Sequence, residues 1–518
     1  MSKHSLLSRV VTLTAALCLA VLVPLPRAAA AGHRPALKSR RPAAMADASA
    51  RAGDARGAVA GLTGASLDWP QFLHDPQHDS VSNATAFTPS NAASATKVWH
   101  WRPPTVSGRP APDLNASPTV VAGVVYIGAV SGGFYALKES TGAMLWRRQL
   151  DTLPPMGTCS ARGITSTAAV LPDPVTGTLT VYVSGARHLY ALNAATGAKL
   201  WRTKIGPTVS NPDAYYNWSS PTVVRGHIYV GLASGCDNPL IRGGVVELSQ
   251  HTGKVLHTWY SVPAGSIGGS VWSTVAASST DSDVWVSTGN ECDPTINACP
   301  AGNKIGHSLS IVHLSGALKF LQAWQVPGAA GHGHDWDFGS SPTLFGGTGT
   351  PPDVGACNKN GVYYALAANP LGSSPLWALT VGIPTQLGAR TGECIASAAW
   401  DGPAGTFYIG GNTTTIRGVT YGGSIGQVNP ATGSYIWHTG LPCSVEGTPT
   451  LDSAGVLGVG TYSCPKPATP DAYLINASTG AILKSLSVGS TKLFGQLVFA
   501  QGTLFVATAT NGLYDFAP

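Results

Sequence analysis

A short phrase recurs along the chain and constrains the fold more than any other feature of the sequence. It consists of a strand ending in an apolar triplet, a turn with Thr-Gly, and an apolar or aromatic residue four positions after the glycine. The clearest copies are residues 134–146 and 189–201, weaker copies lie at 245–257, 309–320, 425–437 and 473–484, and 361–377 has an altered turn. Self-similarity at a fixed period of this size indicates a repeat architecture.

Each repeat unit is expected to form one small β-sheet. The unit begins with a strand such as Ser-Pro-Thr-Val-Val, as at residues 117–121, 220–224 and 341–344, and two more strands follow before the phrase. Alternating apolar residues make half-buried strands, and the glycine permits the positive φ of a tight hairpin. The tryptophan that ends the phrase can pack between neighbouring sheets. The unit is therefore predicted to be a four-stranded antiparallel sheet that buries its two faces by radial stacking.

The spacing of the units predicts their number. The turn glycines fall at 142, 197, 253, 316, 372, 433 and 480, a mean spacing of about 56 residues, so residues 66–518 accommodate eight units. The last unit lacks its final strand, and residues 97–101 look like that missing strand. Joining the two ends in one sheet removes an exposed edge. We predict an all-β, eight-bladed β-propeller closed by N- and C-terminal strands; separate sandwich domains are the alternative that this shared blade disfavours.

The N-terminal region has the composition of an export signal followed by a linker. Lys3 and Arg9 precede an apolar run that ends before Ala28, Ala29 and Ala30, which predicts a signal peptide over residues 1–30. An N-terminal membrane anchor is the alternative, but the run is short for a stable span. Residues 31–65 read as a disordered Ala- and Arg-rich linker. The protein is therefore expected to be secreted or extracytoplasmic.

The positive charge of the chain is concentrated at this end. Residues 1–60 hold nine basic and two acidic residues, which leaves 22 basic and 23 acidic residues in the remainder. A nearly neutral body offers no electrostatic footprint for nucleic acid, so that class of partner is not expected.

The cysteines fit an oxidising compartment. Apart from Cys18 in the leader there are eight, which suggests four disulfides. Closeness in sequence favours 292 with 299, 357 with 394 and 443 with 464, leaving 159 with 236, although the sequence does not fix the pairing. No Cys-x-x-Cys-His segment occurs, so covalent haem is not expected, and no zinc-type spacing occurs either.

The repeat phrase resembles that of the pyrroloquinoline quinone (PQQ) dehydrogenase propellers, over essentially residues 66–518. Residues 268–290 and 333–345 are similar to the cofactor-site segments of quinoprotein alcohol dehydrogenases, nearest to the polyvinyl alcohol dehydrogenase type. The resemblance implies an oxidoreductase that oxidises a small or polymeric alcohol with PQQ and calcium. It also implies a separate electron acceptor, because no haem segment accompanies the repeats.

The resemblance assigns three residues to the quinone. Trp272 would form one wall of the cofactor slot, where a flat quinone stacks on the indole. Arg162 and Lys359 would hold the carboxylates and the quinone oxygen of the cofactor. A tryptophan that packs between blades, and exposed loop charges, are the alternative interpretations of these positions.

Three polar residues match the metal and base positions, and a fourth is an alternative for the base. Asp237 and Asn290 would ligate calcium through oxygen, with a turn-forming asparagine as the alternative for Asn290. Asp337 matches the general base, which also contacts the metal and would take the alcohol proton as hydride passes to the quinone. Asp335 is the neighbouring candidate for the base, one tryptophan earlier in an extended segment.

A non-catalytic PQQ-like propeller that acts as an extracytoplasmic binding or scaffold protein is the second hypothesis. Three features support it: a lone Cys159 where related enzymes have a vicinal pair, an aspartate at 237 where glutamate is common, and the absence of a haem segment. The later repeats also lack expected polar residues around the ring, and residues 445–447 are where a Trp-Gly might stand. Separately, His332, His334 and Asp335 in a Gly-rich loop could bind zinc or copper, with a polar loop at the mouth of the propeller as the alternative.

Overall fold

The computed structural model describes residues 67–518, except for 157–159, 161, 208–210, 212, 238, 296, 329–333, 347–351 and 386–391. The predicted signal peptide and linker therefore lie outside the described residues. Apart from the short 3₁₀ helix η3 (Ala92–Ser94), the described elements are strands.

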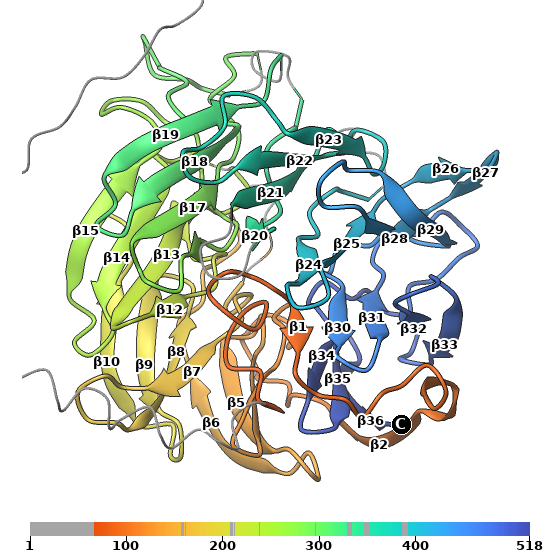
Figure 1. Ribbon diagram of the computed structural model, residues 1–518. Helices are drawn as coiled ribbons and strands as arrows, with labels where there is room; N and C mark the ends of the chain where they lie inside the picture. Colours follow the sequence, from red (N-terminus) through yellow and green to blue (C-terminus); the bar gives the residue numbers. More distant parts are fainter. Residues whose placement is uncertain are drawn as a thin grey trace, which may run out of the picture. The chain divides into compact units, whose positions relative to one another are not determined.

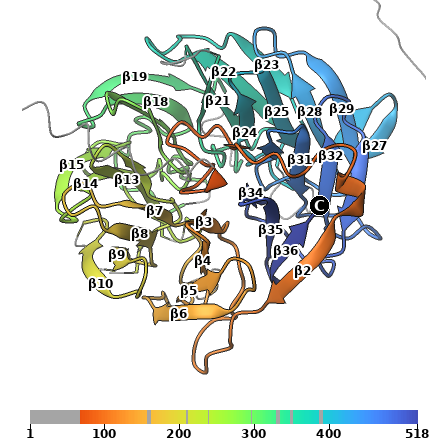
Figure 2. The same cartoon turned by 60° about the horizontal axis from the view of Figure 1, so that its bottom comes forward.

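Apart from one two-stranded hairpin, the described strands form eight sheets, which confirms the predicted eight-bladed propeller. Figure 2 shows them arranged around a common axis. We number the sheets as blades in chain order. Blade 1 consists of β3 (Thr119–Val121), β4 (Val124–Gly128), β5 (Gly133–Lys138) and β6 (Met144–Gln149), and blade 2 of β7 (Ala169–Pro172), β8 (Leu179–Ser184), β9 (His188–Asn193) and β10 (Lys199–Lys204). Blade 3 consists of β12 (Thr222–Val224), β13 (His227–Ser234), β14 (Gly244–Ser249) and β15 (Val255–Tyr260), with β11 (Tyr215–Tyr216) beside β13. Blade 4 consists of β16 (Ala276–Ala277), β17 (Asp283–Ser287), β18 (Ser310–Ser315) and β19 (Phe320–Gln325).

The second half of the chain repeats this plan, with a hairpin added in blade 6 and N-terminal strands joining blades 7 and 8 (Figure 1). Blade 5 consists of β20 (Thr343–Phe345), β21 (Asp353–Asn358), β22 (Val362–Ala367) and β23 (Trp377–Thr380), and blade 6 of β24 (Ala398–Asp401), β25 (Thr406–Gly411), β28 (Gly423–Val428) and β29 (Tyr435–Leu441), with the hairpin β26 (Thr414–Ile416) and β27 (Val419–Tyr421). Blade 7 consists of β30 (Thr450–Asp452), β31 (Val456–Gly460), β32 (Ala472–Asn476) and β33 (Ile482–Leu486), with β1 (Val81–Ser82) parallel to β30. Blade 8 consists of β34 (Val498–Ala500), β35 (Thr503–Thr508), β36 (Gly512–Ala517) and β2 (Thr96–Trp101).

The ring closes as predicted, because the N-terminal strand β2 pairs antiparallel with the C-terminal strand β36 and becomes the outer strand of blade 8. The position of the phrase within a blade differs from the expectation. The phrase contains the third and fourth strands, as β5 and β6 show, so one strand rather than two lies between the Ser-Pro-Thr strand and the phrase.

The tryptophan of the phrase packs between blades, and the turn glycine is its contact. A Cβ added to Gly197 of blade 2 would lie 2.6 Å from the Cε3 atom of Trp146 in blade 1. The Trp146 indole N–H donates to the Ala194 carbonyl in the same turn, at 2.9 Å. The same arrangement joins Trp99 to Gly142, where blade 8 meets blade 1. Glycine is therefore required at these turns by the neighbouring indole as well as by φ.

The predicted positive φ occurs at five of the seven turn glycines, namely 142, 197, 253, 433 and 480. Two are exceptions. In blade 4 the positive φ lies at Leu318 rather than at Gly316. In blade 5 the connection from β22 to β23 spans residues 368–376, so Gly372 does not form a tight two-residue hairpin turn.

The Ser-Pro-Thr signature joins neighbouring blades near the axis. The Ser117 amide donates to the Thr167 hydroxyl of the next blade at 3.1 Å, and the Thr167 amide donates to the Ser220 hydroxyl at 3.0 Å. The Ser220 amide donates in turn to Thr274, and Thr274 to Ser341, at 3.1 and 2.9 Å. Short hydroxyl side chains thus satisfy buried backbone donors where the blades converge.

The segment before η3 also follows the inner edges of the blades. Its carbonyl oxygens accept backbone N–H donors from seven blades: Leu67 from Gln501, Trp69 from Val120, Pro70 from Val170, Pro76 from Ala277, Gln77 from Leu344, Asp79 from Trp400 and Ser80 from Leu451. Blade 3 is reached by a side chain, because the Gln71 oxygen accepts from the Val223 amide. One continuous segment therefore ties the inner strands together.

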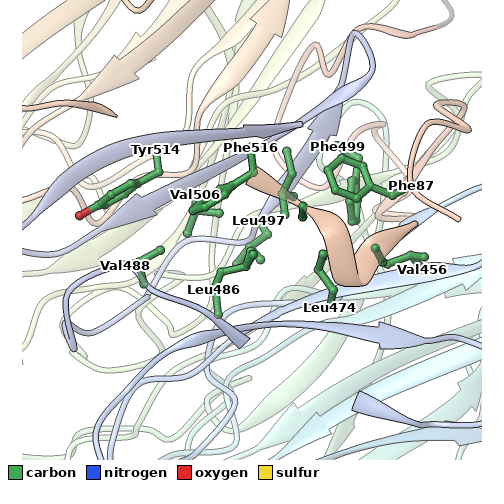
Figure 3. Close-up of a cluster of buried hydrophobic side chains, with 14 of the residues drawn as sticks. Phe87, Val456, Leu474, Leu486, Val488, Leu497, Phe499, Val506, Tyr514 and Phe516 are labelled. Atoms are coloured by element: carbon green, nitrogen blue, oxygen red, sulfur yellow. The ribbon is translucent and has the colours of Figure 1, made fainter. Parts of the chain in front are cut away.

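The hydrophobic core is divided into clusters between adjacent blades. Figure 3 shows the cluster between blades 7 and 8, where Leu474 and Leu486 face Phe499 and Val506, and Phe87 packs in from the N-terminal segment. Each blade is thus buried on both faces only because it has two neighbours.

Three of the predicted disulfides are present, between Cys292 and Cys299, Cys357 and Cys394, and Cys443 and Cys464. The fourth predicted pair involves Cys159, which lies outside the described residues. Within the described part of the chain, no helix is long and apolar enough to cross a membrane.

Candidate functional site

A cavity of about 730 Å³ lies among the blades and is lined by most of the predicted site residues. We call it the central cavity. In an antiparallel blade the second strand ends at the same edge where the first strand begins. Asp237, Asn290 and Lys359 follow the second strands β13, β17 and β21, whereas Trp272 and Asp337 precede the first strands β16 and β20. The fold therefore brings residues from three blades to one end of the propeller.

Lys359 is the charged centre of the cavity. Its ammonium lies 3.0 Å from an Asp335 oxygen, 2.9 Å from an Asp337 oxygen and 3.6 Å from a Glu393 oxygen. Burial by itself lowers the pKa of Lys359, but the three carboxylates raise it well above its usual value. The side chain is therefore a permanent cation, and Trp272 lies with its ring centroid 5.0 Å from the ammonium.

The two aspartates of the Asp-Trp-Asp segment differ in their protonation. Burial raises the pKa of Asp337 to about 7, and the nearby carboxylates of Asp335 and Asp237 add to this effect against the attraction of Lys359. Burial also acts on Asp335, but Lys359 and the hydrogen bond from the Asn290 amide lower its pKa below the usual value. A pair of carboxylates with separated pKa values can divide the roles of anion and proton acceptor.

Trp272 lies beside Asp337 rather than between the outer strands of two blades. Its indole N–H donates to Asp337 Oδ2 at 2.7 Å. The ring lines the central cavity, whereas the tryptophans of the repeat phrase dock on turn glycines. This bond fixes the orientation of the Asp337 carboxylate.

Asn290 and Asp237 lie together with Asp335. The Asn290 amide donates to Asp335 Oδ1 at 2.8 Å and to Asp237 Oδ2 at 3.4 Å. The amide oxygen of Asn290 is buried and accepts no hydrogen bond from any described residue. Asp237 is positioned by Ser234, whose hydroxyl donates to its carboxylate at 2.8 Å, and burial raises the pKa of Asp237. An oxygen acceptor without a donor beside two carboxylates is a setting that suits a hard cation.

Arg162 stands apart from this group. Its guanidinium stacks over the rings of Tyr216 and Trp218, each at 5.3 Å, and donates to the Cys236 sulfur at 3.0 Å. Burial lowers the pKa of Arg162. Trp218 and Cys236 line the central cavity, so Arg162 supports the wall instead of entering the space beside Lys359.

The His-rich loop gives no described metal cluster. Residues 331–333 lie outside the described part of the chain, and His334 stacks on Trp336 with ring centroids 4.1 Å apart. Among the described residues, no group of three or more histidine, cysteine, aspartate or glutamate side chains is arranged to hold a metal ion. The set of Asp237, Asn290 and Asp337 contains two aspartates and one asparagine. It therefore differs from a cluster of three histidine, cysteine or carboxylate side chains.

Several cavity residues were not identified as site residues from the sequence. Glu393 and Glu446 line the cavity together with Tyr462 and Phe494. Burial raises the pKa of Glu446 to about 8, and the neighbouring Glu393 adds to it. The one signal available was their position beside cysteines, since Glu393 precedes Cys394 and Glu446 follows Cys443 by three residues.

The family model described as "Glucose/ethanol/alcohol dehydrogenase, beta-propeller domain" matches residues 69–370. A polyvinylalcohol dehydrogenase from Pseudomonas sp. is 28% identical over 203 residues, which cover 34% of this chain and 30% of that protein. The match thus spans under a third of the relative's length.

Solved structures share the fold. A europium-containing methanol dehydrogenase superposes with a TM-score of 0.67 at 16% identity, covering 88% of this chain and 98% of the other. Quinohemoprotein alcohol dehydrogenase from Comamonas testosteroni gives 0.67 at 16% identity, with 88% and 81% covered. BamB from Moraxella catarrhalis gives 0.51 at 13% identity, with 82% and 100% covered.

Proposed function

Because the chain belongs to the PQQ-type glucose/ethanol/alcohol dehydrogenase β-propeller family, we propose that it oxidises an alcohol, small or polymeric, with PQQ and calcium. The observation that carries the proposal is that Trp272, Asp337 and Lys359 meet in one cavity. The Trp272 indole nitrogen lies 2.7 Å from Asp337 Oδ2, and the Lys359 ammonium lies 2.9 Å from Asp337 Oδ1. A separate acceptor would take the electrons.

The residues present fit both groups. The unsatisfied oxygen of Asn290, beside the Asp237 carboxylate, suits calcium, and Asp337 would complete the oxygen set. Trp272 offers an aromatic face in the cavity, and Lys359 offers a buried cation. Arg162 would act on the cofactor through the wall that it supports. When bound, PQQ supplies a quinone that accepts hydride, and calcium polarises its carbonyl.

The chain's own contribution would be to orient the alcohol and to remove its proton. Asp337 is buried, and its raised pKa makes the ionised form a stronger base than an exposed aspartate. The Trp272 indole holds Oδ2, and Lys359 lies against Oδ1 and stabilises the ionised form of the carboxylate. Asp335 stays ionised and balances the charge of Lys359.

One observation favours the second hypothesis, a non-catalytic binding propeller. Glu393 and Glu446 place two further carboxyl groups in the cavity, and each would repel the carboxylates of PQQ in its ionised form. A scaffold needs the blades but no base.

Calorimetric titration of PQQ into the purified protein, with and without calcium, tests the proposal. We expect saturable, calcium-dependent binding, followed by reduction of an artificial electron-accepting dye when alcohol is added. Trp272→Ala should weaken binding, whereas Trp146→Phe, on an outer strand, should leave it unchanged. Absence of binding under both conditions would overturn the enzyme assignment.

Export belongs to the same proposal. The sequence of residues 1–30 supports cleavage near Ala30, and three disulfides suit an oxidising compartment. Mass spectrometry of the mature N-terminus tests it, and an uncleaved chain in the cytoplasm would contradict it.

A further inference from the structure

One end of the central cavity combines a buried carboxyl group with aromatic walls. We call the set Glu393, Glu446, Tyr462 and Phe494 the acidic-aromatic end. Glu446 is 7% exposed, and its Oε1 atom accepts hydrogen bonds from the Ser444 hydroxyl at 2.8 Å and the Glu393 amide at 3.4 Å. The carboxyl group is therefore held in one orientation on the cavity wall.

Glu446 lacks a cationic partner among the described residues. Among the described residues no basic side chain forms an ion pair with it, and Lys359 is already shared by Asp335, Asp337 and Glu393. Lys492 is two residues before Phe494. Its ammonium lies 4.4 Å from the centroid of the Tyr462 ring and forms no ion pair with Glu446. An ionised carboxylate buried without a cation is costly, and for that reason the carboxyl group holds its proton more tightly. An ammonium group entering from the cavity would stabilise the ionised form and pair with it.

The aromatic walls favour the same kind of ligand. Tyr462 and Phe494 are arranged edge to face, with centroids 5.8 Å apart, and both line the cavity. Aromatic faces beside a carboxylate attract ammonium groups, including those that cannot donate a hydrogen bond. An uncharged alcohol chain would leave Glu446 unpaired.

We propose that the acidic-aromatic end binds the ammonium group of a substrate, so that the alcohols preferred by this chain are amino alcohols. The substrate class rests on the proposed function, whereas ammonium binding by itself does not. A chain of contacts connects the two ends of the cavity, because Glu393 touches Lys359 through its carboxylate and Glu446 through its backbone amide. A cation at Glu446 therefore lies in the same cavity as the proposed base Asp337.

The first test measures binding alone, by calorimetry with tetramethylammonium and with propylammonium. We expect Glu446→Gln, which keeps the size of the side chain, to weaken binding by on the order of tenfold or more. Glu139→Gln, on blade 1 away from the cavity lining, is the matched control and should bind as the parent does. Thermal unfolding of each variant shows that it is folded. Equal binding by the parent and Glu446→Gln, or no binding by either, would overturn the proposal.

The second test compares turnover of choline with that of its neutral carbon isostere, 3,3-dimethyl-1-butanol, in the presence of PQQ and calcium. We expect a higher kcat/KM for choline, and Glu446→Gln should abolish the difference. Oxidation of both alcohols at equal kcat/KM by the parent would refute the ammonium site and leave the proposed function standing. Glu446-dependent ammonium binding without any alcohol oxidation would do the opposite.

Discussion

Lys359 shows how one residue organises the site. It is nearly fully buried, and it compensates the charge of Asp335, Asp337 and Glu393 at once. A buried ion pair adds little when complete, but the removal of one partner leaves uncompensated charge in a medium that solvates it poorly. The cluster therefore depends on its single cation far more than a surface ion pair would.

Replacement of this cation is expected to destabilise the whole protein. Lys359→Met should lower the free energy of unfolding by about 3 to 5 kcal/mol in chemical denaturation at neutral pH. Lys319→Met, at the exposed turn before β19, is the matched control and should change it by less than about 0.5 kcal/mol. Similar losses in the two variants would show that the carboxylates are satisfied without Lys359.

At the scale of the elements, the turn between the third and fourth strands carries two constraints. The turn needs a residue with positive φ, and in most blades it also receives the indole of the preceding blade. Gly197 and Gly177 separate these effects. Their φ values are +66° and +68°, but only Gly197 faces an indole, while nothing lies within 4 Å of a Cβ added to Gly177.

The two glycines give a direct comparison. Gly177→Ala should cost about 1 to 2 kcal/mol, because alanine is strained at positive φ. Gly197→Ala should cost about 1 to 3 kcal/mol more, because the new methyl group displaces Trp146. Thermal and chemical unfolding measure both. Equal costs would mean that the indole moves away freely and does not fix the interface between blades.

The closing sheet contains a buried acid whose ionisation opposes folding. Asp515 on β36 is 1% exposed, and burial raises its pKa to about 7, with Glu139 contributing. The folded state therefore binds this proton more tightly than the unfolded chain. Ionisation of Asp515 therefore lowers the free energy of unfolding. This loss is absent at about pH 4 and below, increases as the pH rises, and is complete above pH 7.

This cost should be visible in one variant. Asp515→Asn removes the titration and should raise the free energy of unfolding by about 1 to 3 kcal/mol at pH 8, with a smaller gain at pH 5. Denaturation at the two pH values measures it. A gain that does not depend on pH would point to packing rather than to ionisation.

For the whole molecule, closure of the ring is the decisive step. The four main strands of blades 1 to 7 follow one another along the chain, with the hairpin β26–β27 inserted in blade 6 and β1 added to blade 7. Blade 8 instead joins β2 to β34, β35 and β36 from the other end of the chain. Trp99 on β2 then docks on Gly142 of blade 1, just as Trp146 docks within the continuous part of the chain. The contact is the same, but only the first one holds a strand that has no covalent neighbour in its own sheet.

Hydrogen exchange should distinguish these two contacts. Trp99→Ala and Trp146→Ala should each cost about 3 to 5 kcal/mol. Trp99→Ala should also release protection across β2 and β36 together, whereas Trp146→Ala should affect its own hairpin and the turn at Gly197. Exchange measured by mass spectrometry after matched labelling times checks this. Retained protection in β2 would show that backbone pairing alone closes the ring.

The sequence by itself determined the architecture, because the signals of a propeller are local. The phrase with its glycine and tryptophan defines one hairpin, its period gives the number of blades, and the orphan strand at residues 97–101 gives the closure that β2 and β36 display. The sequence also allowed site residues to be selected, because they lie in segments that resemble those of quinoprotein alcohol dehydrogenases. These residues are Trp272, Asn290, Asp337 and Lys359. Local pattern failed where the turn changed, as at Leu318 and Gly372.

Only the tertiary structure decided which of these residues meet and what charge they carry. The pKa of Asp337 rises to about 7 because burial and two carboxylates act on it in the folded cavity, and Lys359 gains three partners from loops between 335 and 393. Arg162 lies behind Trp218, and Glu446 enters the cavity from another blade. Electrostatic energies depend on distance and burial, and the order of residues along a chain specifies neither.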